Sequence, residues 1–203
     1  MLQVDGLCCC YPQRELFSHW SARIPPALSL VRGGDGSGKT TLLRLLAGEL
    51  PADAGELQIN GISLRDRAAV YRQQVFWVEP RSVAFDQITA LNYFNLVQRA
   101  YPGLDEPLLG DLTEGLSLAP HLDKPLYMLS TGSKRKVWLA AAFASGAAVT
   151  LLDEPFAGLD KASIAFVLEL LEDAGADPVR AWIVAHHEAP GELALAQIIE
   201  LGD

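Results

Sequence analysis

The nine residues from 33 to 41, Gly-Gly-Asp-Gly-Ser-Gly-Lys-Thr-Thr, most restrict what this chain can fold into. They match the pattern G-x-x-x-x-G-K-[ST], with an apolar β-type run at 27–31 before them and strong helix formers at 42–47 after them. Glycines let the backbone curve so that successive N–H groups face phosphate oxygens, and the helix adds the positive end of its dipole. The sequence therefore predicts a nucleoside triphosphate site formed by Gly33, Gly34, Asp35, Gly36, Ser37, Gly38, Lys39, Thr40 and Thr41. Lys39 is expected to reach the β- and γ-phosphates, and the Thr40 hydroxyl to ligate Mg²⁺.

Length and charge limit the partners of such a chain. The 203 residues suit one domain, since about 100–200 residues per domain is usual. The formal net charge of −9 disfavours binding to nucleic acid without regard to sequence. We therefore expect one domain and no nucleic-acid partner.

The cysteines and the apolar segments point to a reducing compartment and to a chain that does not cross a membrane. The three cysteines are consecutive, at 8–10, and neighbours in a strand face opposite sides, so they cannot link distant segments or surround a metal ion. Asp5 interrupts any leader-like segment at the start of the sequence. The longest uncharged run, 137–152, is shorter than the ~18 residues that a membrane span needs. We expect a soluble protein whose membrane role, if it has one, depends on a partner.

Strand and helix patterns alternate along most of the chain. Two strands joined by a turn are predicted at 1–20, and a strand at 56–59 precedes the hairpin signal Asn60-Gly61. Further buried strands are predicted at 75–78, 147–152, 181–185 and 196–201, and helices at 133–145 and 161–171. Between 82 and 129 the periodicity is helical and is interrupted by prolines.

This order of elements predicts an α/β fold. We expect a P-loop NTPase core with a largely parallel sheet, antiparallel N-terminal strands and an inserted helical subdomain. Residues 1–81 and 146–203 would form the ATP-binding core, and residues 82–145 the helical subdomain, within a single domain of 1–203.

Two acids follow directly on the predicted strand at 147–152. A carboxylate at the end of a buried strand is held beside the phosphate loop, so Asp153 is a candidate Mg²⁺ ligand. The next acid, Glu154, points elsewhere and is a candidate base for an attacking water.

A serine, a glycine and three basic residues mark the start of the helix predicted near 133. Taken alone, Ser130 indicates no more than a helix cap. Its position is more informative, because it ends the predicted helical segment and precedes the strand that carries the acid pair. The basic residues at 134–136 are consistent with a phosphate- or nucleic-acid-binding patch and equally with a solvated helix face.

In combination, these motifs resemble the ABC-type ATPases, and more narrowly the nucleotide-binding subunits of ABC transporters. The resemblance rests on the phosphate loop, Leu-Ser-x-Gly at 129–132, Leu-Leu-Asp-Glu-Pro at 151–155, Gly-Leu-Asp at 158–160 and Val-Ala-His-His-Glu at 184–188. It covers essentially the whole chain. The short length and compact spacing are similar to the haem-exporter ATPases of cytochrome c maturation and to small drug-export ATPases.

The resemblance implies a role for each matching residue. Tyr11 would stack on adenine, Asp153 would hold Mg²⁺ and its water, and Glu154 would be the general base. Ser130 and Gly132 would contact the γ-phosphate bound to the opposite protomer, and Asp160 would lie in the loop that communicates across that dimer interface.

Two positions are less well defined by the resemblance. The histidine that holds the base and its water in line has two candidates, and the small-residue-His-acid pattern favours His187 over His186. A glutamine that senses Mg²⁺ is expected after the strand at 75–78, where Glu79-Pro80 stands, and Glu79 can still ligate the ion. In the family's signature, which begins with Leu-Ser-x-Gly at 129–132, Thr131 and Ser133 replace the usual glycine and glutamine, and the extra Cβ of Thr131 narrows the room for backbone approach to the triphosphate.

We therefore expect an ATP-hydrolysing subunit with Mg²⁺ as cofactor that powers transport, with export favoured. Its partners would be a transmembrane permease subunit and a second ATPase subunit, either a copy of itself or a paralogue. We expect the protein to be cytoplasmic and bound peripherally to the cytoplasmic face of a membrane. Two alternatives stay open: a nucleic-acid- or ribosome-associated ABC ATPase, and a nucleotide-gated scaffold that hydrolyses poorly.

Overall fold

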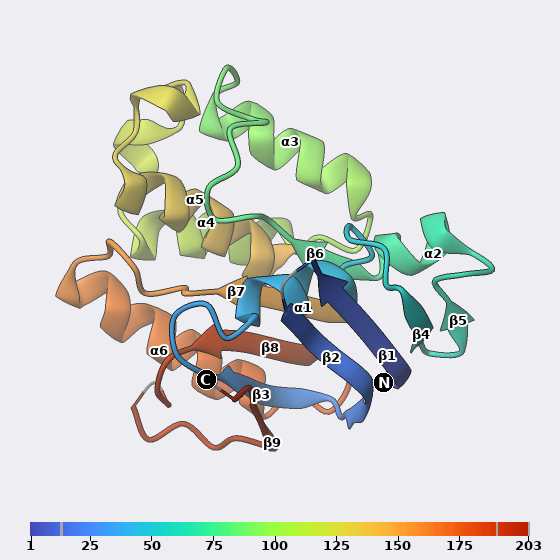
Figure 1. Ribbon diagram of the computed structural model, residues 1–203. Coiled ribbons are helices and arrows are strands. Elements are labelled where there is room, and N and C mark those ends of the chain that lie inside the picture. The colour runs from blue at the N-terminus through green and yellow to red at the C-terminus, as the bar shows by residue number, and fades with distance from the viewer. Residues whose placement is uncertain (13, 190, 203) are drawn as a thin grey trace.

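The computed structural model describes residues 1–12, 14–189 and 191–202, and two sheets organise them (Figure 1). The first is antiparallel, with the order β2-β1-β4-β5. Its strands are β1 (Leu2–Tyr11), β2 (Arg14–Ile24), β4 (Ala54–Ile59) and β5 (Ile62–Ser63). The predicted N-terminal antiparallel strands are therefore present, and β4 and β5 turn at Asn60 and Gly61, whose φ values of 50° and 76° suit the tight hairpin that their sequence predicts.

The second sheet is the parallel sheet of the core, with the order β6-β7-β8-β3-β9. All of its pairings in the described residues are parallel. Its strands are β3 (Ala27–Arg32), β6 (Val75–Trp77), β7 (Val149–Asp153), β8 (Ala181–His186) and β9 (Gln197–Glu200). Each lies within a residue or two of the strand that its apolar run predicts.

Helices cover both faces of the parallel sheet, as alternating elements require. They are α1 (Lys39–Leu46), α2 (Ala68–Gln73), α3 (Ala90–Ala100), α4 (Glu106–Gly115), α5 (Thr131–Ala144) and α6 (Lys161–Gly175), with 3₁₀ turns at Ala119–His121 and Leu126–Met128. Helix α5 begins earlier than its pattern suggests because the Ser130 side chain accepts a hydrogen bond from Ser133 N and caps it. The sequence did not predict α2, which has six residues and follows a charged segment.

Alternate residues of the parallel strands enter two hydrophobic clusters, one on each face of the sheet. Leu30 and Val184 face the cluster that also holds the apolar residues of α3, α4, α5 and α6. Val31 and Ile183 face the cluster of α1, α2 and the antiparallel sheet. The helical subdomain, at the top of Figure 1, thus shares a core with one face of the sheet. Its boundaries at 82 and 145 stay a prediction.

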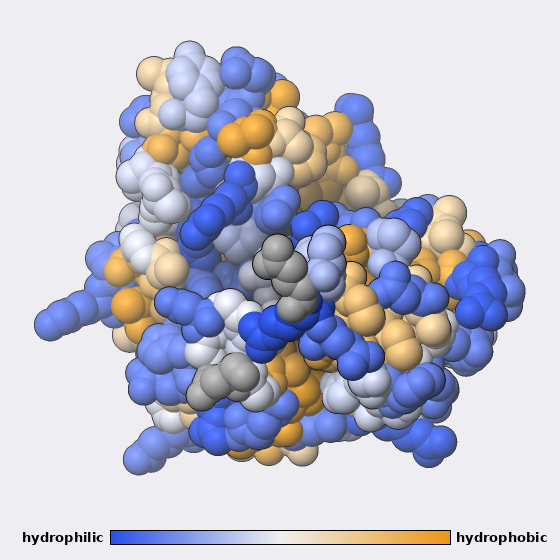
Figure 2. Space-filling view, in the orientation of Figure 1, coloured by the Kyte–Doolittle hydropathy of each residue, from blue (hydrophilic) through white to orange (hydrophobic). Residues whose placement is uncertain are grey.

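The surface is mostly polar on the face seen in Figure 2, where hydrophobic residues form small separate groups. Among the described residues, no helix is both long enough and apolar enough to cross a bilayer.

Tyr71 anchors α2 against the end of α1. Its side chain is fully buried, and its hydroxyl donates a hydrogen bond of 2.8 Å to the Leu46 carbonyl. Burial raises the pKa of Tyr71. We expect Tyr71→Phe to lower the free energy of unfolding by about 1–3 kcal/mol, because the Leu46 carbonyl loses its donor inside the protein.

Urea denaturation followed by circular dichroism measures this change. Tyr127→Phe is the matched control, since Tyr127 is 58% exposed and should change stability little. Equal losses in the two variants would contradict the role of the buried hydrogen bond.

Candidate active site

The phosphate loop connects the end of β3 to the start of α1, as predicted. Gly36 and Gly38 have φ values of 76° and 104°, which side chains with a Cβ rarely adopt. Gly33 has no space for a Cβ, which would lie 2.4 Å from Ser37 Oγ and 2.9 Å from the Leu201 carbonyl oxygen. The glycines of the motif are thus explained by backbone conformation and close packing.

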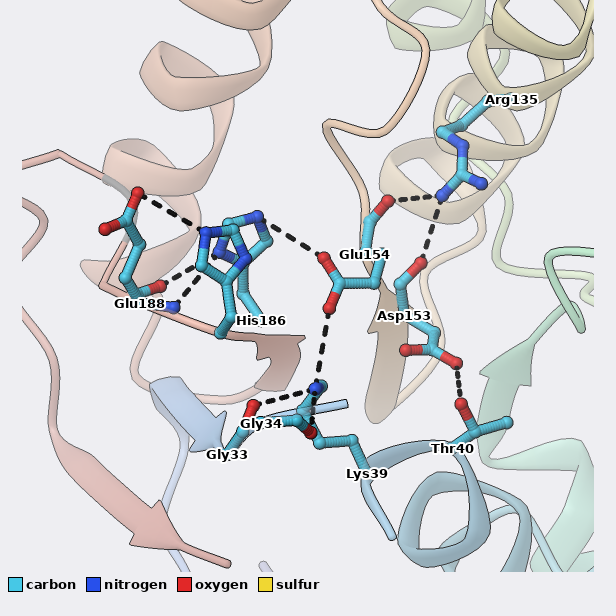
Figure 3. A network of polar contacts seen from close by, with 10 residues as sticks. Gly33, Gly34, Lys39, Thr40, Arg135, Asp153, Glu154, His186 and Glu188 are labelled. Atoms are coloured by element: carbon cyan, nitrogen blue, oxygen red, sulfur yellow. Dashed lines mark hydrogen bonds and ion pairs between the residues drawn. The ribbon is translucent and has the colours of Figure 1, made fainter. Parts of the chain in front are cut away.

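Lys39 is held in the centre of this loop and is only 8% exposed. Its ammonium donates hydrogen bonds of 2.8 and 3.0 Å to the carbonyls of Gly33 and Gly34, and it lies 3.7 Å from Glu154 Oε1 (Figure 3). One cation therefore connects the phosphate loop with the acid pair at the end of β7.

Thr40 and Asp153 form the part of the site suited to a divalent cation. The Thr40 hydroxyl donates a 2.6 Å hydrogen bond to Asp153 Oδ2, although the residues are 113 positions apart. Burial raises the pKa of Asp153, whereas the Thr40 hydrogen bond and the charges of Lys39 and Arg135 act in the opposite direction. Two adjacent oxygen donors, one of them a buried carboxylate, fit Mg²⁺, which prefers oxygen ligands.

Glu154 has a strained backbone that fixes its side chain. Its φ of 45° lies in the left-handed region, and its amide donates a 2.9 Å hydrogen bond to the Ala185 carbonyl of β8. The two carboxylate oxygens face different partners: Oε1 faces Lys39, and Oε2 lies 3.4 Å from His186 Nε2. Glu154 is therefore oriented between the phosphate loop and β8.

His186 lies against Glu154, and His187, which the sequence favoured, lies beside His186 with its ligand atom within 4.8 Å of the Glu154 carboxylate. Strand β7 pairs with β8 so that Asp153 lies opposite Ala185, and the next residues of the two strands, Glu154 and His186, are therefore neighbours. The His186 side chain is 12% exposed, whereas that of His187 is 59% exposed and lies 3.5 Å from Glu188. Which of the two histidines holds the base in line stays a prediction, and the geometry favours His186 because it is the less exposed and lies 3.4 Å from the carboxylate.

Arg135 completes this group, and sequence reasoning did not single it out. Its guanidinium donates to the backbone carbonyls of Asp153, at 3.1 Å, and of Glu154 (Figure 3). Burial lowers the pKa of Arg135, and the charges of the two acids oppose that change. Arg135 thus joins the first turns of α5 to the end of β7.

Comparison with known proteins identifies the family. The sequence pattern of the ABC transporter family matches residues 26–157. The chain belongs to the ABC transporter family. A relative in Nitrosomonas europaea, a "Cytochrome c biogenesis ATP-binding export protein CcmA", is 33% identical over 175 residues, which are 85% of this chain and 82% of the relative. In Treponema pallidum, a "Zinc transport system ATP-binding protein TroB" is 32% identical over 197 residues, covering 92% of this chain and 72% of the relative.

The fold of solved structures agrees with this assignment. One structure, described as the ATP-binding subunit of an ABC transporter, superposes with a TM-score of 0.82 at 26% identity. The match covers 92% of this chain and 79% of the solved chain. The protein is an ABC-type ATPase: it binds and hydrolyses ATP as a subunit of an ATP-driven transporter.

The signature residues of this ABC-type ATPase gather at the starts of α5 and α6. A Cβ on Gly132 would lie 2.2 Å from the Gly158 carbonyl oxygen, so the two loops touch. Asp160 caps α6 by accepting from Ser163 N and forms a 2.7 Å ion pair with Lys136. These contacts lower the pKa of Asp160, with the Lys136 hydrogen bond as the main cause. The three residues predicted to act across a dimer, Ser130, Gly132 and Asp160, therefore belong to one surface.

The three consecutive basic residues have different partners within the chain. Arg135 points inward to the acid pair, while Lys134 pairs with Asp86 and Lys136 with Asp160. Neither of the two interpretations drawn from sequence, a phosphate- or nucleic-acid-binding patch and a solvated face, describes this arrangement.

The remaining predicted residues border an open cleft of ≈ 1070 Å³ beside the phosphate loop. Tyr11 and Glu79 both line it, and the Tyr11 hydroxyl lies 3.4 Å from Thr41 Oγ1. Arg14, which sequence reasoning did not select, also lines the cleft and donates a 3.0 Å hydrogen bond to the Gly36 carbonyl. Its closeness in sequence to Tyr11, the residue predicted to contact adenine, could have pointed to Arg14.

Proposed function

We propose that this ABC-type ATPase hydrolyses Mg²⁺-bound ATP by in-line attack of water on the γ-phosphorus, with Glu154 as the base. The observation that carries the proposal is the position of the Glu154 carboxylate between Lys39, at 3.7 Å, and His186 Nε2, at 3.4 Å. A base held between the phosphate-binding lysine and a second polar side chain has a fixed direction toward the reacting phosphate.

Each side chain has a defined part in this reaction. Glu154 accepts a proton from the water as the new P–O bond forms and the bond to ADP breaks. His186 keeps the Glu154 carboxylate in line, and Lys39 stabilises charge on the phosphate oxygens. Thr40 and Asp153 would hold Mg²⁺, which when bound neutralises charge on the β- and γ-phosphates. Glu79, at the rim of the cleft, is proposed as a further ligand.

The nucleotide is proposed to lie along the open cleft. Tyr11 would stack on adenine, since it is 47% exposed at the cleft and its hydroxyl lies beside Thr41. The phosphate-binding residues are those of the loop from Gly33 to Thr41, whose N–H groups at the start of α1 favour an anion.

The site is proposed to be completed by a second chain, a copy or a paralogue. Ser130 and Gly132 occupy the start of α5, while a different set of residues lines the cleft that includes the phosphate loop. A head-to-tail pair would place this helix N-terminus, with its N–H groups, against the γ-phosphate bound by the partner.

The transmembrane partner is proposed to be a permease that exports its substrate, with this ATPase peripheral on the cytoplasmic face. Support comes from the relatives in Nitrosomonas europaea and Yersinia pestis, which are named as ATP-binding export proteins of cytochrome c biogenesis. The TroB relative is named for zinc transport, so the substrate class is left open. Purification of the tagged chain from membranes, with identification of a polytopic protein cross-linked to it, tests this partner against a nucleic-acid-associated role.

The two-chain site can be tested by mixing two inactive variants. Lys39→Ala removes the phosphate-binding cation, and Ser130→Tyr blocks the proposed surface of α5. Each variant alone should hydrolyse ATP at less than about a hundredth of the wild-type rate. In a mixture, random pairing makes half of the dimers mixed, each with one intact site, and should restore up to about a quarter of the wild-type rate. A Ser130→Tyr variant as active as wild type would contradict the proposal.

A further inference from the structure

A pair of histidines and the proposed base form a cluster with the composition of a transition-metal site. Glu154, His186 and His187 each offer one ligand atom, and these atoms lie within 4.8 Å of one another. Three such ligands, two imidazoles and a carboxylate, are the set that binds Zn²⁺ with one coordination position left open. The cluster lies beside the oxygen donors of Thr40 and Asp153 and differs from them in ligand type.

The separation of Glu154 and His186 suits a small ion. The Glu154 Oε2–His186 Nε2 distance is 3.4 Å, and ligand atoms that each lie 2.0–2.1 Å from a tetrahedral zinc ion are about 3.3 Å apart. The two imidazole rings lie side by side, with centroids 4.2 Å apart and planes inclined by 32°. His187 is exposed and can adjust its rotamer to complete the set.

The backbone of Glu188 holds the His186 ring in place and is compatible with a cation at Nε2. The His186 Nδ1 lies 3.0 Å from the Glu188 carbonyl oxygen, which can only accept a hydrogen bond (Figure 3). In the tautomer with Nδ1–H, the ring donates to this carbonyl and the Nε2 lone pair faces the Glu154 carboxylate. In the other tautomer, Nδ1 accepts a 3.4 Å hydrogen bond from Glu188 N, and Nε2–H donates to Glu154. A cation between Nε2 and the carboxylate would satisfy both acceptors of the first tautomer, whereas without a cation the second tautomer lets His186 hold Glu154 in line. A histidine whose second nitrogen donates to a backbone carbonyl is the usual arrangement of a metal ligand.

We propose that Glu154, His186 and His187 bind Zn²⁺ or a similar transition-metal ion, and that this ion inhibits hydrolysis without displacing ATP. Glu154 Oε2 would be occupied by the ion, so the carboxylate would lose its freedom to accept a proton from water. Glu154 Oε1, Lys39 and the phosphate loop lie on the other side of the carboxylate and would keep their contacts. The inhibitory part rests on the proposed role of Glu154, whereas metal binding does not.

Binding is tested first, without nucleotide. The full chain carries Cys8→Ser and Cys10→Ser, because these thiols are alternative zinc ligands, and excess Mg²⁺ is present. Competition with a chromophoric chelator should show one Zn²⁺ per chain, and Co²⁺ should give the visible absorption of a tetrahedral site. His186→Gln and His187→Gln should each weaken zinc binding at least about tenfold.

Two matched variants separate this site from others on the chain. His121→Gln removes a partly exposed histidine of the helical subdomain, whose Nδ1 contacts Lys124. The zinc affinity of this variant should not change. Asp153→Asn alters the proposed Mg²⁺ ligand, and zinc binding should persist. Absence of zinc binding in the parent chain, or an equal loss in His121→Gln and His187→Gln, would overturn the proposal.

Inhibition is tested next, at saturating Mg-ATP with free zinc held by a zinc buffer, since ATP itself binds zinc. Turnover should fall at least about tenfold, ATP affinity should stay within about twofold, and a zinc-selective chelator should restore turnover. His187→Gln, compared with its own zinc-free rate, should need at least about tenfold more zinc. Zinc binding with unchanged turnover would overturn the inhibitory part. A chain without any turnover would refute the proposed function, while the binding data would still decide the metal site.

Discussion

Glu154→Gln should reduce steady-state ATP turnover by about a hundredfold or more. Glutamine has nearly the shape of glutamate but cannot accept the proton of the attacking water. The strained backbone of residue 154 and its hydrogen bond to Ala185 do not depend on the carboxylate, so the fold should persist. ATP binding should remain within about threefold, because Lys39 and the other loop residues are unchanged.

Phosphate release and size-exclusion chromatography with light scattering, both with Mg-ATP, measure this result. A dimer that requires ATP and outlasts that of the wild type is expected, since bound ATP is not consumed. Glu172→Gln is the control, because Glu172 is an exposed acid on α6 and should keep full turnover. If Glu154→Gln retained more than about a tenth of wild-type turnover, another group would have to act as the base.

Gly132→Ala should impair both stability and activity. The added Cβ would lie 2.2 Å from the Gly158 carbonyl oxygen, and a backbone atom cannot swing away as the tip of a side chain can. Either the start of α5 or the loop before α6 must move. We expect the free energy of unfolding to fall by about 1–3 kcal/mol. Turnover should fall at least about tenfold, because the surface proposed to complete the partner's site would be displaced.

Gly110→Ala provides the matched comparison within the same subdomain. Gly110 is exposed in α4, and nothing beyond its chain neighbours and the backbone of its own helix lies within 4 Å of an added Cβ. Alanine favours a helix over glycine, so this variant should be up to about 1 kcal/mol more stable, with unchanged turnover. Urea denaturation and phosphate release measure both variants. Wild-type stability and turnover in Gly132→Ala would show that the contact with Gly158 relaxes without consequence.

The sequence predicts this site best where chemistry depends on neighbours along the chain. The phosphate loop and the Asp153-Glu154 pair are recognisable because each is a short motif joined to a strand. The two sheets and the helical subdomain also follow from periodicity, since apolar runs, alternating patterns and glycine turns mark their boundaries.

Residues whose role depends on pairing between distant segments were harder to assign. Which of His186 and His187 lies against Glu154 depends on how β8 is aligned with β7, and the sequence of either strand alone does not give this alignment. Arg135 has basic neighbours on both sides, so composition gives no sign that only this side chain turns toward the acid pair. Helix α2 was missed because it is short and is held by one buried tyrosine.

The Arg135 side chain has a consequence for communication between active sites. It starts in the helix capped by Ser130, which is the surface proposed to meet the partner's nucleotide, and ends on the carbonyls of Asp153 and Glu154. Two hydrogen bonds to adjacent carbonyls tolerate little displacement before they weaken. A shift of this helix on contact with the partner's ATP would therefore alter the alignment of the chain's own base. In a pair of such chains the two sites would turn over in a mutually dependent manner, and the rate would rise more steeply with ATP concentration than for independent sites.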